Sequence, residues 1–433
     1  MRRMTLAVAA LAAGSIMLTA CMAGGSTGSG AAGDGEDVEL TFFTFETPNL
    51  TPEYWDETIA NAEKAVPGVK INKIVGENTL EYMQSLYASG QAPDIWLGGA
   101  SLLPFVAKGQ LAEWSEDELG DLEIPPGFQG VVDGKIYGPP GIGAQAIPLV
   151  YYNKDAFERA GIDSVPTNWD EFEDACAKLK DAGITPLELG GGGEDTWVAG
   201  MTSSAIIASD IMGNDPDWFT KKAAGEVSFT DPEFLATTEK VANLAKAGYF
   251  DMDGLSRTYP EVEQSFLDQD AAMYVMGNWF AATADKGLDF ELGVFAMPND
   301  EGKNIVPVPT GGPAIVVSAD APDVDLAKKV ALEFITNPKN VEKNTIADAS
   351  LIPPQFDVPE GMGDAYLATL DAYRAAFDSD SIVAAWANST GMTPPGFAGA
   401  MDPATIDLIN GRMTPEAYGE YLDKKWDELA VTE

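Results

Sequence analysis

The sequence predicts an α/β fold divided into two lobes, each with a central sheet flanked by helices. The chain has 433 residues, which is too long for one compact hydrophobic core and long enough for two. Within residues 38–97, short apolar runs alternate with amphipathic stretches, as in a parallel sheet whose strands are joined by helices. Two lobes built in this way would enclose a cleft.

The first lobe is expected to begin with three strands, at residues 38–45, 69–74 and 94–97. Helices are predicted between them, one from the cap Thr51-Pro52 to Val66 and one over residues 80–89. In such sheets, ligands meet the loops at the carboxyl ends of the strands. Two loops qualify, and they contain Glu46, Thr47, Gly98 and Ser101.

Residues 149–180 are the most informative stretch. An apolar run predicts a strand over residues 149–152, and a short helix over residues 156–160 ends at Gly161, where a left-handed C-terminal residue is expected. Thr167, with Asp170 three residues later, is predicted to cap a second helix. One face of that helix is apolar and belongs in a core: Trp169, Phe172, Cys176 and Leu179.

The remaining helices carry ordinary start signals. They are predicted to begin at Asp231-Pro232, near Glu261, at Leu326 and after Thr414-Pro415. The last one has an inner stripe of Tyr418, Leu422 and Trp426. Between them, residues 190–193 are four glycines, which we expect to bring backbone close to a ligand and to direct Trp197 toward it.

Charge and composition exclude several functions. With 68 acidic and 26 basic residues the formal charge is −42, which would repel a nucleic acid but not a neutral ligand. The chain has no histidine, which excludes Ser-His-Asp and Cys-His catalysis. We expect no metal and no cofactor. Cys21 and Cys176 lie in such different contexts that no disulfide is expected.

The N-terminus predicts secretion. Residues 1–20 have a basic start and an apolar run over residues 6–18, as in a signal peptide. Leu18-Thr19-Ala20-Cys21 resembles a bacterial lipobox, so Cys21 is the expected lipid anchor on the outer face of a bacterial membrane. The rival interpretation, a transmembrane helix, needs about 20 apolar residues. Residues 21–37 are rich in Gly and Ser and predict a flexible tether.

Five stretches in order resemble extracellular solute-binding proteins of family 1, the sugar receptors of ABC importers. They are YYNKDAFERAGI with PTNWDEF at residues 151–172, Pro93-Asp94-Ile95-Trp96, AAMYVMGNW at residues 271–279, GGPAIVV at residues 311–317 and GRMTPEA at residues 411–417. The resemblance covers nearly the whole chain. It implies a periplasmic-binding-protein-like fold with hinge strands, lobe 1 being residues 38–147 and 313–357 and lobe 2 residues 148–312 and 358–433.

The resemblance also implies a carbohydrate site. Aromatic faces pack on the C–H patches of a sugar ring, and polar side chains hold its hydroxyls. Trp279 corresponds to a sugar-stacking aromatic with Asn278 beside it, and Asp195 and Trp197 correspond to a second-lobe loop. The crossing segments supply Gln145, Gly311 and Gly312. Phe397 or Trp386 is expected as the aromatic of the tail, although the family pattern is not clear there.

The function implied is a lipid-anchored monomer that traps an oligosaccharide by hinge closure and delivers it to an ABC permease. A surface-anchored glycoside hydrolase remains an alternative, because Glu46, Glu194 and Asp195 offer pairs of carboxylates. A carbohydrate-binding adhesin with a flat aromatic platform is another. Peptide or polyamine cargo is a further possibility that the sequence leaves open.

Overall fold

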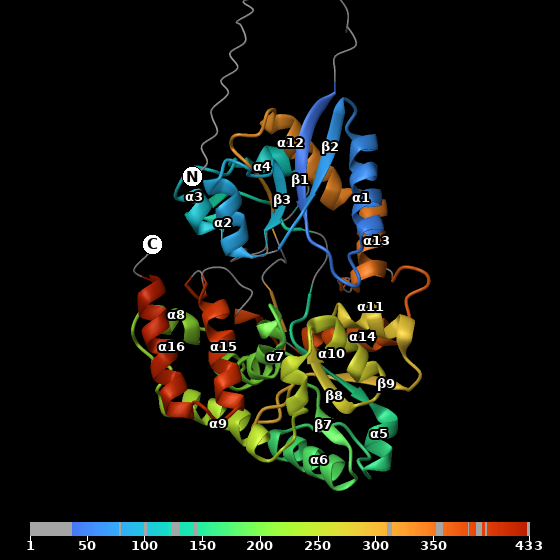
Figure 1. Ribbon diagram of the computed structural model, residues 1–433, viewed down its shortest axis with the longest axis vertical. Helices are drawn as coiled ribbons and strands as arrows, with labels where there is room; N and C mark the ends of the chain where they lie inside the picture. The colour runs from blue at the N-terminus through green and yellow to red at the C-terminus, as the bar shows by residue number, and fades with distance from the viewer. Residues whose placement is uncertain are drawn as a thin grey trace, which may run out of the picture. The chain divides into compact units, whose positions relative to one another are not determined.

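The computed structural model describes residues 37–430, apart from residues 78, 99–101, 121, 123–129, 142–144, 310–313, 352–357, 380, 387–391 and 395. Two four-stranded sheets flanked by helices dominate these residues, which confirms the predicted α/β class (Figure 1). Within the same ranges, no helix is both long and apolar enough to cross a membrane.

The first sheet has the strand order β11-β3-β1-β2. Its members are β1 (Val38–Thr44), β2 (Val69–Val75), β3 (Ile95–Gly98) and β11 (Ala314–Val317). β1 is parallel to both β2 and β3, as the sequence predicts. β11 comes from more than 200 residues later and runs antiparallel to β3, which no local pattern indicates.

Helices cover both faces of this sheet because its central strand is apolar on both sides. Leu40 and Phe42 of β1 pack toward α1 (Pro52–Ala65) and α12 (Val324–Thr336), whereas Phe43 packs toward α2 (Leu80–Ala88) and α3 (Leu103–Val106) (Figure 1). Thr51 caps α1 by accepting a hydrogen bond from the Tyr54 amide, as predicted. The remaining elements of this part are α4 (Glu116–Leu119), β4 (Val131–Val132), β5 (Lys135–Ile136) and α13 (Pro338–Asp348).

The second sheet has the order β7-β8-β6-β9. Its members are β6 (Leu149–Asn153), β7 (Thr185–Leu187), β8 (Ala271–Met276) and β9 (Leu292–Phe295). Side chains that alternate along β6 and β8 enter two separate cores, so this sheet is also covered on both faces. One core includes α5 (Lys154–Arg159), α6 (Trp169–Asp181), α7 (Thr196–Ile207), α9 (Pro232–Lys246), α15 (Phe397–Ile409) and α16 (Pro415–Ala430). The other includes α10 (Tyr259–Leu267), α11 (Phe280–Gly287) and α14 (Asp364–Asp378).

The cap of α6 lies one residue later than predicted. Asn168 rather than Thr167 is the N-cap, and its side-chain oxygen accepts from the Glu171 amide at 3.0 Å. Thr167 instead donates to the Glu171 carboxylate. Asparagine is as good a cap as threonine, so the sequence pattern alone did not separate them. The predicted inner faces are confirmed, because Trp169, Phe172, Cys176 and Leu179 of α6 and Tyr418, Leu422 and Trp426 of α16 are all buried.

The predicted crossing segments lie side by side. Ile147 donates a hydrogen bond of 2.9 Å to the Pro307 carbonyl, and β10 (Val306–Val308) pairs in parallel with β12 (Ile382–Ala384). The predicted lobe boundaries stay a prediction. The remaining elements are η1 (Ala208–Met212), α8 (Trp218–Ala223) and η2 (Met252–Ser256).

Candidate ligand-binding site

A cavity of about 790 Å³ lies among residues that come from both sheet systems. This volume falls within the usual range of small-molecule sites, roughly 300–1,000 Å³. The first sheet contributes the loops after β1 and β2, and the second contributes the first residues of α7, α10 and α11 together with one face of α15. The lining includes the following residues: Glu46, Thr47, Glu77, Gln145, Asp195, Trp197, Met201, Ser204, Tyr259, Trp279, Asn344, Asp348, Ser350, Trp386, Ala398, Met401 and Asp402.

Three aromatic rings form one wall of the cavity. The ring centroids of Trp197 and Tyr259 are 5.1 Å apart, and those of Trp197 and Trp279 are 6.4 Å apart. Trp197 and Trp279 remain partly exposed, so part of each ring is available to a ligand. The three residues are far apart in the sequence, and only the packing of α7, α10 and α11 brings them together. We call Trp197, Tyr259 and Trp279 the aromatic wall.

Asn278 does not line the cavity but positions Trp279. Its side chain is fully buried, where Oδ1 accepts from the Ala146 amide and Nδ2 donates to the Ala349 carbonyl, each at 2.8 Å. Gly277 must be glycine for a related reason. A Cβ on Gly277 would lie 2.3 Å from the Trp279 ring. The Gly-Asn-Trp sequence therefore supplies one ring that lines the cavity and two residues that hold it.

A chain of hydrogen bonds links the aromatic wall to the loop after β1. The side-chain amide of Asn49 donates a hydrogen bond to the main-chain carbonyl of Trp279 at 2.9 Å. The Thr283 hydroxyl donates to the side-chain oxygen of Asn49 at 3.2 Å. Thr283 also contacts the buried carboxylate of Glu263, which accepts from the Tyr259 hydroxyl at 2.6 Å. Burial raises the pKa of Glu263 to about 7, against the smaller lowering by these hydrogen bonds.

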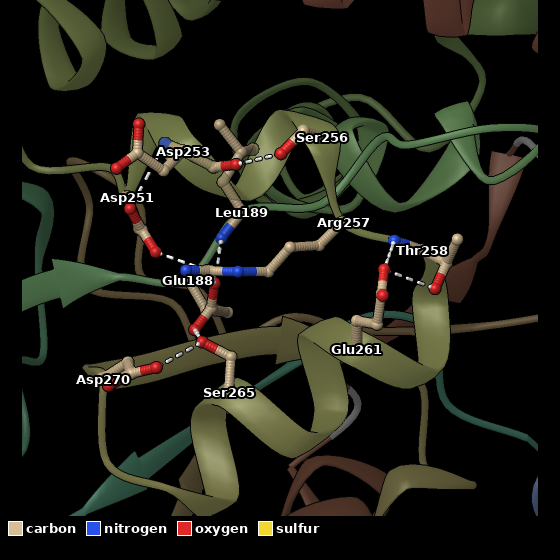
Figure 2. Close-up of polar contacts among 10 residues, drawn as sticks. All are labelled: Glu188, Leu189, Asp251, Asp253, Ser256, Arg257, Thr258, Glu261, Ser265 and Asp270. Atoms are coloured by element: carbon tan, nitrogen blue, oxygen red, sulfur yellow. Dashed lines mark hydrogen bonds and ion pairs between the residues drawn. The ribbon is translucent and has the colours of Figure 1, made fainter.

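A second network holds the turn that leads into α10, as Figure 2 shows. The guanidinium of Arg257 forms ion pairs with the buried Glu188, at 3.0 Å, and with Asp251. Ser265 donates to the other Glu188 oxygen at 2.8 Å. Burial raises the pKa of Glu188 to about 7. Tyr259 lies two residues after Arg257, so this network helps to fix the position of Tyr259 in the aromatic wall.

The prediction for the four glycines, residues 190–193, is corrected. None of them lines the cavity. Instead the amide of Gly192 donates to the Arg257 carbonyl at 2.8 Å, and a Cβ on Gly192 would lie 2.3 Å from the Ser256 carbonyl oxygen. Gly192 is needed because two backbone segments approach each other closely, and Gly190 because the side chains of Val198 and Val262 pack against it.

Five carboxylates line the cavity, and no Lys or Arg does within the residues that the structure describes. Glu46 and Glu77 are exposed, whereas Asp195, Asp348 and Asp402 are half-buried. Protein donors already hold Asp195, which accepts from the Tyr259 amide at 2.8 Å and from the Trp197 indole at 3.3 Å. Burial raises the pKa values of Asp348 and Asp402 to about 7.

The cavity brings together seven of the residues predicted for the site: Glu46, Thr47, Gln145, Asp195, Trp197, Trp279 and Trp386. Asn278, Gly98 and Phe397 do not line it, although Leu97 beside Gly98 does. Phe397 is fully buried and stacks on Phe229, with ring centroids 5.4 Å apart, so of the two candidates in the tail only Trp386 reaches the cavity. Cys21, Ser101, Gly311 and Gly312 lie outside the described residues.

Sequence reasoning missed several lining residues. These residues lie on helices or just after a helix end, in stretches that carry no ligand motif: Tyr259, Asn344, Asp348, Ser350 and Asp402. The Glu261 carboxylate accepts hydrogen bonds from the Thr258 amide and from the Thr258 hydroxyl, each at 2.8 Å. This capping pair marks the start of α10 and is therefore a local sequence signal for the position of Tyr259. For Asp402 the sequence has no comparable signal. Among the described residues no group of three or more potential metal ligands is assembled.

Comparisons with known proteins agree with this fold. A curated relative described as a probable sugar-binding periplasmic protein, from Mesorhizobium japonicum, is 24% identical over 354 residues, covering 78% of this chain and 80% of that protein. A solved chitin oligosaccharide binding protein superposes with a TM-score of 0.80 at 25% identity, covering 92% of this chain and all of that one. The solute-binding protein RafE in complex with raffinose gives a TM-score of 0.72 at 20% identity, covering 90% and 99%.

The family comparison covers the larger part of the chain. The profile described as bacterial extracellular solute-binding protein matches residues 47–342, which include the whole second sheet, every strand of the first sheet except β1, and most of the cavity lining. That span is more than half of the 433 residues. This chain therefore belongs to the family of bacterial extracellular solute-binding proteins.

Proposed function

We propose that this protein captures an oligosaccharide in the cavity and delivers it to the permease of an ABC importer. The observation that carries the proposal is the aromatic wall of Trp197, Tyr259 and Trp279 in a cavity that also presents carboxylates and amides. A sugar ring needs both kinds of surface, because its faces are C–H patches and its edge is a row of hydroxyls. The volume of about 790 Å³ leaves room for more than one ring.

Similar proteins support a carbohydrate ligand. The relative from Mesorhizobium japonicum is named for sugar binding, and the similar solved structures include proteins that bind chitin oligosaccharide and raffinose. Some relatives are instead named for binding sn-glycerol-3-phosphate, for example one from Rhizobium meliloti that matches 41% of this chain. The five carboxylates of the described lining would repel a phosphate, and no Lys or Arg of that lining offsets them. The lining therefore favours a ligand without negative charge.

Trapping by hinge closure follows from the origin of the lining residues. Glu46 and Thr47 come from the loop of the first sheet, and the aromatic wall comes from helices of the second lobe. A ligand that contacts both lobes stabilises the closed arrangement, whereas a ligand bound to one lobe alone has no such preference. Compaction in small-angle scattering when a binding sugar is added would support closure, and unchanged scattering at saturation would contradict it.

We propose a binding role without catalysis. The family consists of solute-binding proteins, and Asp195 is already held by two protein donors, which leaves it poorly suited as a nucleophile. A panel of neutral oligosaccharides of two to six units, screened by thermal shift and then by calorimetry, tests the proposal. At least one should bind without being cleaved. Failure of the whole panel would contradict the proposed ligand class, and turnover of a bound sugar would favour a glycoside hydrolase.

The same proposal includes a lipid anchor at Cys21, a free tether over residues 21–37 and a monomeric receptor outside the membrane. Mass spectrometry of the membrane fraction should find an N-terminal Cys21 carrying acyl chains, and Cys21→Ala should release the protein. Retention of that variant at the membrane would contradict the anchor. Sedimentation of a soluble form should give the mass of one chain.

A further inference from the structure

Among the three half-buried carboxylates that line the cavity, Asp402 is the exception in its lack of a partner. No described residue donates a hydrogen bond to it, and no salt bridge reaches it within the same ranges. Burial is the cause that raises its pKa, with no cation near enough to oppose the effect. By contrast, Asp195 has two protein donors, and Asp348 accepts a bond from Asn49 at 3.4 Å and lies within the field of Lys286.

The surroundings of Asp402 leave space for a ligand group. Asp402 lies on α15, and one of its oxygens rests against Gly200 of α7, where a Cβ would come within 2.9 Å. Four cavity residues lie on the same two helices within about one turn of Gly200 and Asp402: Met201, Ser204, Ala398 and Met401. Because Asp402 is itself a lining residue, a compact polar group in the cavity can approach its carboxylate.

We propose that Asp402 forms a subsite for a protonated amino group, so that the preferred ligands are oligosaccharides containing amino sugars. This inference rests on the proposed function and specifies its ligand class. An ammonium group supplies both things that the site lacks: hydrogen-bond donors and a compensating positive charge. Folding has already removed the carboxylate from most of its water, so pairing with it costs little further desolvation of the protein. The four other carboxylates of the lining add to a potential that favours cations.

The test compares two sugars that differ only at the nitrogen. Glucosamine oligomers of two to six units and the matching N-acetylglucosamine oligomers are titrated into the purified protein at pH 7 by calorimetry. They are chosen because a similar solved protein binds chitin oligosaccharide. We expect the glucosamine oligomer to bind at least tenfold more tightly than its acetylated counterpart in low salt, and the difference to shrink as salt is added.

The second part of the experiment repeats both titrations with the variant Asp402→Asn. The variant should lose the preference for the free amine, so that its Kd values for the two sugars agree within threefold. Asp407→Asn is the matched control, because Asp407 lies on the same helix, pairs with Arg412 and does not line the cavity. That variant should keep the wild-type preference, and unfolding midpoints should show that both variants fold.

Three results would overturn the inference: no binding of glucosamine oligomers, equal or weaker binding than the acetylated form, or a preference that persists in Asp402→Asn. The comparison of the two sugars on the unmodified protein is decisive even if a variant fails to fold. A neutral oligosaccharide that binds while the amine gives no advantage would refute the amino-group subsite alone. Failure of the entire neutral panel would instead count against the proposed function.

Discussion

The side-chain amide of Asn49 donates a hydrogen bond of 2.9 Å to the main-chain carbonyl of Trp279, 230 residues later in the chain. Asn49 is 5% exposed and follows the first strand, whereas Trp279 begins the helix α11 of the second lobe. The same asparagine accepts from Thr283. One side chain therefore ties the loop after β1 to the aromatic wall.

Asn49→Ala is expected to weaken both stability and binding. The change leaves the Trp279 carbonyl and the Thr283 hydroxyl without this partner, which costs about 1–3 kcal/mol when such groups stay buried. Urea unfolding and calorimetry with a binding oligosaccharide measure the two effects. Asn72→Ala is the control, because the Asn72 amide makes only an exposed 3.5 Å contact. Equal behaviour of the two variants would show that the Asn49 bond contributes nothing.

Trp279→Ala is expected to raise the Kd of the oligosaccharide about thirtyfold, equivalent to about 2 kcal/mol, because it removes a ring of the aromatic wall. Trp279→Phe should retain part of the affinity, since a smaller ring still covers a sugar face. Calorimetry provides the measurement. Phe377→Ala removes an aromatic side chain that is 54% exposed on α14 and does not line the cavity, and its Kd should stay that of the unmodified protein. An unchanged Kd for Trp279→Ala would remove this residue from the site.

The buried carboxyl group of Glu263 is expected to make the free energy of unfolding depend on pH. Its pKa is raised from 4.5 to about 7 by burial, so between those values the folded protein keeps a proton that the unfolded chain has released. The free energy of unfolding therefore falls as pH rises from about 4.5 to 7 and levels off above that range. Glu263→Gln should remove roughly 1 kcal/mol per pH unit from this slope. Urea midpoints at half-unit steps from pH 4.5 to 8 would reveal the change.

The capping residue Glu261 provides a control of opposite sign. Hydrogen bonds from Thr258 lower the pKa of Glu261, so its contribution is present above the unfolded pKa and is lost as pH falls through the folded value. Glu261→Gln should thus alter the profile only at the acid end. A Glu263→Gln profile parallel to that of the unmodified protein between pH 5 and 7 would contradict the burial argument.

Arg257→Leu is expected to destabilise the protein by about 3 kcal/mol, because it leaves the buried Glu188 beside Asp251 without a cation. Adding Glu188→Gln should recover more than half of that loss, since the charge that needed compensation is then gone. Chemical unfolding at pH 8, above the raised pKa of Glu188, gives the clearest difference. A double variant no more stable than Arg257→Leu alone would show that the two side chains are not energetically coupled.

Much of the fold follows from sequence patterns of short range. The parallel strands β1, β2 and β3 and the inner faces of α6 and α16 appear where apolar periodicity predicts them. A period of two or of 3.6 residues reports which side of an element avoids water. The resemblance to the family's motifs, rather than periodicity, indicated Trp197, Trp279 and Asp195, and the structure places all three along one cavity.

The tertiary structure alone decided which of these residues reach the cavity. Asn278 and Phe397 were expected at the ligand but are buried and do not line the cavity, whereas Asp402 was not expected and does line it. Periodicity defines the buried face of a helix but not the neighbour that covers it. That neighbour comes from distant chain, as when Gly200 of α7 makes room for Asp402 of α15. Composition determined that this protein is acidic and lacks histidine, and packing determined where one of its carboxylates would lie without a partner.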